Sequence, residues 1–403
     1  MGFIEQGGAA TAVRTPSPVR DVAAAAHTLA RGMAGPERFV RELLGQAGIT
    51  IDGSAPHDIT VHDRRFYRRV ARDGSLGLGE SYMDGWWDCP AIDQMIARIH
   101  RANLPASIRR NWRLLLTALQ ARLLNLQSVR RAFEVGRRHY DIGNDLYRAM
   151  LDRRMVYTCA YWNGAKTLEQ AQEAKLELIC RKLGLRPGMR VLELGCGWGS
   201  FARYAAENYG VEVTGYTVSE EQVAMGREVC AGLPVELRLD DYRNARGTYD
   251  RVLSIGIMEH VGPRNYRTYM EVVDRCLAPG GCSLIHTIGG NLSEAASDPW
   301  THRYIFPNGR VPSVAQLSRA MEGLFTFQDL HAFGPHYDPT LMAWYRNFVE
   351  AWPALRDKYG DRFYRLWSYY LLMSAAAFRT GYLTLFQIVM SRPHEPALEC
   401  RQS

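Results

Sequence analysis

The chain has 403 residues, of which 47% are hydrophobic and 23% charged, so it is long enough for two or three domains with a large core. This composition excludes disorder except at the ends, and no run of about 18 apolar residues is present that could span a membrane. The formal net charge of +7 lies mostly in residues 1–133, which contain 18 arginines and 12 acidic residues.

The N-terminus lacks the pattern of a secretory signal peptide, and residues 1–22, rich in Gly, Ala, Pro, Ser and Thr, are expected to be a disordered leader. Eight cysteines occur without a C-x-x-C pair, which favours a reducing compartment without disulfides or a metal site. We therefore expect a cytoplasmic protein.

Residues 23–103 contain short helical patterns, the turn signals Asp52-Gly53 and Asp73-Gly74, and an aromatic cluster around Trp86, which together predict a small mixed domain. Residues 104–133 repeat apolar side chains at helical spacing among arginines, which predicts a basic amphipathic helix. Such a helix suits an anionic bilayer or nucleic acid, but it is equally typical of a link between two domains whose arginines pair with acidic residues.

From residue 134 to the end, apolar strands at 191–194, 211–216, 235–239, 252–255 and 283–286 alternate with helical patterns near 200–208, 219–230 and 265–277. This alternation predicts an α/β fold with a doubly wound, mostly parallel sheet. After Thr287 an insertion-like stretch with three prolines follows, and then a long aromatic helical region from Leu341 to Met390.

The clearest local motif is VLELGCGWG from Val191, in which a buried strand leads into a G-x-G-x-G turn and a helix near Ser200. Glycines let the backbone approach a ligand, and the helix N-terminus adds positive potential. Nicotinamide and flavin enzymes use a related loop. Glu193 before the first glycine, and a second strand that ends in TVSEEQ instead of a ribose-binding acid, favour S-adenosylmethionine.

Eight motifs in order extend this interpretation: HYDIGNDLYRAML from His139, MVYTCAYW ending at Trp162, VLELGCGWG, TVSEEQ, IMEHVGPRNY, LIHTIG, PW…YIFPNG and HYDPTLMAWY from His336. With them the chain resembles the cyclopropane-fatty-acid-phospholipid synthases and the related mycolic acid cyclopropane synthases over about 134–392. The resemblance extends to the N-terminal segment, since phospholipid-acting members carry such a domain. It implies a Rossmann-like class I methyltransferase fold with a seven-stranded sheet.

The resemblance implies transfer of a methylene group from S-adenosylmethionine to the cis double bond of an unsaturated acyl chain in a membrane phospholipid. A double bond is a poor nucleophile, so positive charge develops on the alkyl chain, and a base must remove a proton for ring closure. Aromatic faces stabilise a nearby cation by about 0.5–2 kcal/mol each. For Trp344 and Tyr345, core packing is the better interpretation.

In the family a bicarbonate ion is the base, and its implied ligands here are Cys159, Glu259, His286, Ile288 and Tyr337. Glu259 and His286 would orient the ion and relay its proton. Tyr337 and two backbone amides would donate to its oxygens. Taken singly, His286 could be a structural histidine and Glu259 a helix cap.

The resemblance also implies which residues contact S-adenosylmethionine. Its methionine portion is expected at residues 157–158, its ribose near 217–222 and its adenine edge at 241–242. The implied set is Tyr157, Thr158, Glu193, Gly195, Cys196, Gly197, Gly199, Thr217, Ser219, Gln222, Asp241 and Tyr242. Ser374 stands where some members have a cysteine that was once a candidate nucleophile, so a covalent thiolate is not expected there.

Three alternatives remain open from the sequence: a lipid C-methyltransferase with a methyl- or methylene-branched product, a lipid-binding protein without activity, and a nucleic-acid methyltransferase. We favour a cyclopropane-fatty-acid-phospholipid synthase over these three alternatives. We expect it to be a homodimer that lies peripherally on the inner face of the membrane, and we expect no nucleic acid as partner.

Overall fold

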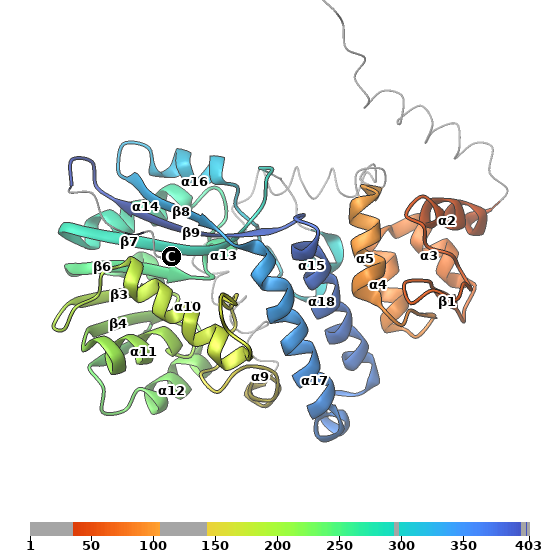
Figure 1. Cartoon of the computed structure of the whole chain (residues 1–403), viewed down its shortest axis with the longest axis horizontal. Helices are drawn as coiled ribbons and strands as arrows, with labels where there is room; N and C mark the ends of the chain where they lie inside the picture. The colour runs from red at the N-terminus through yellow and green to blue at the C-terminus, as the bar shows by residue number, and fades with distance from the viewer. Residues whose placement is uncertain (1–34, 105–142, 294–297, 396–399, 401–403) are drawn as a thin grey trace, which may run out of the picture.

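The computed structural model describes residues 35–104, 143–293, 298–395 and 400. Figure 1 shows a twisted sheet with helices on both faces beside a smaller group of helices formed by residues 35–104. None of the helices in these ranges is long and apolar enough to cross a membrane. The predicted leader at 1–22 and nearly all of the predicted basic helix at 104–133 lie outside the described residues.

Seven strands form the main sheet in the spatial order β5-β4-β3-β6-β7-β9-β8. Strand β9 runs antiparallel to the other six strands, so the predicted mostly parallel α/β fold is confirmed. The strand order reverses at β3, which has β4 on one side and β6 on the other, and such a switch point is where open α/β sheets bind ligands. The strands are β3 Arg190–Leu194, β4 Glu212–Thr217, β5 Val235–Leu239, β6 Tyr249–Ile255, β7 Leu277–Gly289, β8 Thr326–Ala332 and β9 Thr384–Ser391.

Helices cover both faces of the sheet because successive strand residues point to opposite sides. Val191 packs with one set of helices, whereas Leu192 and Leu194 pack with the other. The first set is α10 Leu168–Lys182, α11 Ser200–Tyr209 and α12 Glu220–Val229; the second is α13 Met258–Val261, α14 Tyr266–Cys276 and α16 Val314–Met321.

A pair of long helices, α17 Tyr337–Tyr359 and α18 Asp361–Arg379, stands between the sheet and the N-terminal helices (Figure 1). Gly360, at φ 74°, separates the two helices, a conformation that favours glycine. The short helix α9 Asn144–Met150 packs on α17. Their side chains join those of the N-terminal helices in one continuous core.

The N-terminal part contains four helices and a two-stranded antiparallel ribbon, with Trp87 fully buried inside it. Its elements are α2 Pro36–Gly45, β1 Thr60–Val61, α3 Arg65–Asp73, α4 Ser75–Met83, β2 Trp87–Asp88 and α5 Ile92–Arg101. The turn signals are confirmed, since Asp52 has φ 64° and Gly74 separates α3 from α4 with φ 58°.

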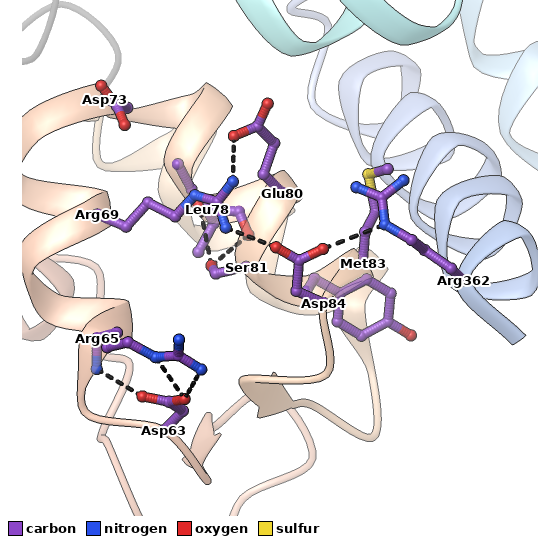
Figure 2. Close-up of polar contacts among 12 residues, drawn as sticks. Asp63, Arg65, Arg69, Asp73, Leu78, Glu80, Ser81, Met83, Asp84 and Arg362 are labelled. Carbon is purple, nitrogen blue, oxygen red and sulfur yellow. Dashed lines mark hydrogen bonds and ion pairs between the residues drawn. The ribbon is translucent and has the colours of Figure 1, made fainter.

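The two parts meet across α4, α5, α18 and the short helix α15 Pro299–Tyr304. Trp300 is fully buried there, and a Cβ on Gly79 would lie 2.4 Å from its ring. Figure 2 shows that Arg69 bridges Glu80 and Asp84, and that Asp84 also reaches Arg362 of α18. The interface is therefore both apolar and ion-paired.

The predicted helical region from Leu341 to Met390 is wrong in its last part, because Thr384–Ser391 forms strand β9. Gly381, at φ 69°, lies between α18 and this strand. Seven of the eight strand residues are buried, so the segment shows no alternation of apolar and polar side chains, and periodicity alone does not separate it from a buried helix.

Candidate active site

A long cavity opens at the carboxyl ends of β3, β4 and β6. Its wall combines the loops after these strands with residues 155–158, which precede α10, and with Pro307 and Asn308 from the proline-containing stretch. This is the position at which doubly wound sheets bind nucleotides.

The glycine loop forms the floor of this cavity. Gly195 has φ 81° and Gly197 φ 55°, and a Cβ on Gly195 would lie 2.9 Å from the side chain of Ile257. The backbone N–H groups of Gly195 and Cys196 both donate to the carbonyl of Tyr216 at 2.9 Å, which fixes the loop against β4. Positive φ angles therefore favour glycine at positions 195 and 197, and the close approach of Ile257 also leaves no room for a larger side chain at position 195.

One end of the cavity lies at β4 and β5. Here Thr217 donates to the side chain of Gln222 at 2.8 Å, and Asp241 accepts from the N–H of Arg243 at 2.9 Å. Thr217, Gln222, Asp241 and Tyr242, which were predicted to contact the cofactor, line the cavity. Ser219 is buried, lies outside the cavity lining and caps α12 through the N–H of Gln222.

Four further side chains of the cavity wall are Tyr157, Thr158, Lys175 and Glu193. Oε2 of Glu193 is buried and has no hydrogen-bond partner among the described residues. Burial raises the pKa of Glu193 to about 8, opposed by the charge of Lys175. All predicted cofactor residues therefore line one cavity, except Gly199 and Ser219, which cap α11 and α12.

Lys175 is the residue that sequence reasoning missed. It occupies the buried stripe of α10, together with Leu168, Ala171 and Leu178. A lysine at such a position departs from the expected apolar pattern, and this was the available signal.

The second predicted site lies next to this cavity, where α13 meets the end of β7. Oε1 of Glu259 accepts the backbone N–H of Ile288 at 2.6 Å, while Oε2 is buried and unpartnered within the described chain. Burial raises the pKa of Glu259 to about 7. The N–H of Ile288 was expected to face an anion, and the structure instead pairs it with Glu259.

His286 on β7 is 1% exposed and contacts Gln387 of β9, with 3.2 Å between His286 Nδ1 and Gln387 Nε2. In this orientation of the amide, Gln387 donates to Nδ1, so the ring proton resides on Nε2. Nε2 is buried without a partner in the described parts of the chain. Burial, with the charges of Lys175 and Lys182, lowers the pKa of His286 well below its ordinary value, so the ring is neutral.

Cys159 lies in the segment before α10, which packs against α17, the helix that begins at Tyr337. The N–H of Ala160 and the indole of Trp162 both donate to the hydroxyl of Thr340, one helical turn after Tyr337, at 3.2 and 2.9 Å. Burial raises the pKa of the Cys159 thiol well above its ordinary value. Cys159 is therefore a neutral thiol at physiological pH.

Aromatic rings connect the two sites. Trp344 contacts Tyr157 of the cavity and Tyr337, with ring centroids 5.2 and 6.1 Å apart. The hydroxyls of Tyr157 and Tyr370 lie 2.8 Å apart. Phe333 contacts His286 at 5.9 Å. The cavity thus adjoins an apolar, aromatic region that contains buried polar atoms.

Comparison with known proteins agrees with this geometry. The family model for mycolic acid cyclopropane synthetase matches residues 127–388. Cyclopropane-fatty-acyl-phospholipid synthase of Escherichia coli (strain K12) is 52% identical over 361 residues, which cover 90% of this chain and 94% of that protein. Tuberculostearic acid methyltransferase UfaA1 of Mycobacterium tuberculosis is 31% identical, over 87% of each chain.

Solved structures agree as well. The cyclopropane synthase MmaA2 from Mycobacterium tuberculosis has a TM-score of 0.61 and 30% identity, and the match covers 64% of this chain and 98% of that one. The mycolic acid cyclopropane synthase CmaA1 complexed with SAH and CTAB has a TM-score of 0.60 and 31% identity, with coverages of 64% and 97%.

The sheet order, the glycine loop and the cavity at the switch point, together with these matches, define a class I S-adenosylmethionine-dependent methyltransferase. Within that class, the chain belongs to the cyclopropane synthase family, which includes the mycolic acid cyclopropane synthetases and the cyclopropane-fatty-acyl-phospholipid synthases.

Proposed function

We propose that this chain converts the cis double bond of an unsaturated acyl chain in a membrane phospholipid into a cyclopropane ring. The observation that carries the proposal is the buried pair of Glu259 and His286, each with an unpartnered polar atom, at an aromatic region beside the cofactor cavity. The high identity with the phospholipid synthase of Escherichia coli supports the same substrate class.

Ring formation needs two bond changes in sequence. The π electrons of the alkene form a bond to the methyl carbon as its bond to sulfur breaks, so the sulfonium becomes a neutral thioether. The second alkene carbon is left as a cation. A proton then leaves the new methyl group, and the electron pair of that C–H bond closes the ring.

The aromatic region suits the cationic step. Tyr157 of the cavity wall packs against Trp344, and an aromatic ring face stabilises a nearby cation by about 0.5–2 kcal/mol. Water would trap the cation as an alcohol, so the buried, apolar surroundings of Tyr337 and Phe378 also protect the product.

The proposed residues for a bicarbonate ion are Glu259, His286 and Tyr337, with Cys159 and Ile288 beside them. They fit an anion, because Nε2 of His286 is a protonated, unpartnered donor and Glu259, with a pKa of about 7, carries a proton in part at neutral pH. When bound, bicarbonate supplies a base that accepts the methyl proton. The N–H of Ile288 would act by holding Glu259 in place.

The placement of S-adenosylmethionine follows from the cavity. We assign the adenosine to the end at Thr217, Gln222, Asp241 and Tyr242, and the amino-acid portion to the end at Tyr157 and Thr158. The sulfonium would then lie above the glycine loop. Glu193, with a buried and unpartnered oxygen, supports binding of a positively charged group.

We further propose that residues 23–103, with the basic segment at 104–133, dock the enzyme on the inner face of an anionic membrane as a homodimer, which would raise membrane avidity. The arginine excess of residues 1–133 supports this proposal. Deletion of residues 1–133 should abolish binding to vesicles that contain phosphatidylglycerol, and retained binding would refute this role.

The enzymatic proposal is tested with purified protein, S-adenosylmethionine, bicarbonate buffer and vesicles of a monounsaturated phospholipid. The expected acyl chains are heavier by one CH2 group and lack the double bond, as mass spectrometry and loss of the olefinic NMR signals will show. High-field cyclopropyl protons distinguish the ring from a methyl- or methylene-branched product, the alternative that the similarity to UfaA1 favours.

A further inference from the structure

Lys175 of α10 is 1% exposed and lies in the wall of the cavity. Its Nζ donates to Oγ1 of Thr158 at 3.0 Å. Burial of an ammonium is costly unless the charge is paired and hydrogen-bonded. Burial accordingly lowers the pKa of Lys175 to about 8, although interactions with Asp152, Cys159 and Glu193 act to raise it. A costly cation in a cavity wall is typical of a functional residue.

A second lysine of the same helix provides a contrast. Lys182, two turns further on, is also buried, and its ammonium lies 2.9 Å from a carboxylate oxygen of Asp329. That pair joins α10 to β8 and lies away from the cavity wall. Lys175 contacts a hydroxyl instead, and no carboxylate of the described residues lies within ion-pair distance of its Nζ.

The contact with Lys175 determines where the hydroxyl group of Thr158 can donate its hydrogen bond. An ammonium has three N–H donors and no acceptor, so Oγ1 of Thr158 accepts from Lys175. The hydroxyl hydrogen of Thr158 must therefore point elsewhere. Because Thr158 also lines the cavity, this hydrogen is available to an acceptor inside it.

The position of Thr158 indicates which part of the cofactor would accept the hydrogen bond from its hydroxyl group. A Cβ on Gly256, just after β6, would lie 2.8 Å from Cγ2 of Thr158, so Thr158 lies at the β6 side of the cavity, opposite β4 and β5. With the adenosine at β4 and β5, the amino-acid portion of S-adenosylmethionine reaches Thr158. This portion carries an α-carboxylate and an α-ammonium; Lys175, which contacts Thr158, brings a positive charge beside this part of the cavity wall.

We propose that Lys175 is a positioning residue for the α-carboxylate of S-adenosylmethionine, and that it acts through the hydroxyl of Thr158. The ammonium orients the hydroxyl toward the carboxylate, and its charge attracts the carboxylate across the cavity wall. This inference rests on the proposed placement of the cofactor.

The test compares two ligands that differ in the amino-acid portion: S-adenosylhomocysteine, which has the carboxylate, and 5′-methylthioadenosine, which lacks it. Calorimetry on Lys175→Met should show affinity for S-adenosylhomocysteine reduced by about 10- to 100-fold, the range for loss of a charge-assisted hydrogen bond. Affinity for 5′-methylthioadenosine should be unchanged. This selective loss would not result from a merely structural role.

Lys182→Met is the matched control, because it removes a buried lysine from the same helix without touching the cavity. It should lower stability and leave both affinities unchanged. Thr158→Val should reproduce the selective loss, and adding Lys175→Met to it should cause little further loss. Thr158→Val also tests the proposal if Lys175→Met does not fold.

Equal loss of both ligands in the Lys175 or Thr158 variant, or no loss of either, would overturn the role of Lys175. Failure of the unaltered enzyme to bind S-adenosylhomocysteine would instead contradict the proposed cofactor site. The two failures are therefore distinguishable.

Discussion

The carboxyl group of Glu259 and the backbone N–H of Ile288 form a 2.6 Å hydrogen bond that joins α13 to the end of β7. This bond occupies Oε1 and leaves Oε2 buried without a partner in the described residues. It also fixes the carboxyl group near His286, two residues earlier on the same strand. The bond therefore orders one half of the proposed anion site before any ligand binds.

Glu259→Gln should lower kcat by about 100-fold or more, the range for loss of a proton-transfer group. Glutamine keeps a carbonyl oxygen for the N–H of Ile288 but cannot relay a proton. Affinity for S-adenosylmethionine, measured by calorimetry, should not change. Glu271→Gln, on the exposed surface of α14, is the control and should keep normal turnover. Normal kcat in Glu259→Gln would contradict the proposed site.

Cys159→Ala should keep kcat within a few-fold of normal. The burial that raises the pKa of this thiol leaves it protonated near neutral pH, and its Sγ contacts the carbonyl of Ala160 at 3.3 Å. Ser374 in α18 has no thiol to offer, so its replacement by alanine should be equally mild. Steady-state assays of both variants provide the check, and a loss of kcat above about 100-fold in Cys159→Ala would favour covalent thiolate chemistry.

Arg69→Met should reduce the free energy of unfolding by about 2–4 kcal/mol, because it removes the main cation from the buried carboxylate of Glu80 (Figure 2). Adding Glu80→Gln should restore part of this stability. Urea unfolding at pH 7 measures both effects.

Arg65→Met is the matched control for this prediction. Its pair with Asp63 is exposed, at 70% and 29%, so the loss should be clearly smaller than that of Arg69→Met. Equal losses in the Arg65 and Arg69 variants would mean that the buried ion pairs of Arg69 add nothing to the free energy of unfolding beyond an exposed pair.

His100 should make the contact between α5 and the turn after α18 sensitive to acid. It contacts Thr380 at 3.2 Å and stacks on Tyr382, and burial lowers its pKa to about 4. The unfolded chain therefore binds a proton more readily than the folded chain does. Stability is complete above about pH 6.5 and falls toward pH 4, by at most about 1.4 kcal/mol per pH unit.

His100→Gln should show a shallower fall in unfolding free energy than the unaltered protein between pH 6.5 and 4. Other buried histidines, such as His260, contribute their own slope, so the difference between the two proteins is the informative quantity. An unchanged slope would show that His100 does not titrate with unfolding.

Much of the catalytic half is predictable from the sequence because it depends on local patterns. The continuous apolar strands and the glycines of the loop identify the sheet and the switch point without tertiary information. One cavity gathers ten of the twelve residues predicted to contact the cofactor, and the other two cap helices.

The remaining features depend on contacts between distant segments. Strand β9 is buried on both faces, so its sequence has no alternation, and β8 is recognisable only as its partner. Lys175 lines the cavity only because α10 packs beside residues 155–158. The pairing of Glu259 with Ile288 joins residues 29 positions apart in the sequence.

The most direct test of ring formation uses S-adenosylmethionine with a CD3 methyl group, a monounsaturated phospholipid in vesicles and the unaltered protein. The proposed mechanism predicts an acyl chain that has gained a CD2 group, lacks the double bond, and gives the high-field NMR signals of cyclopropyl methine protons. A product that retains all three deuterons, or that shows no such signals, would contradict ring closure.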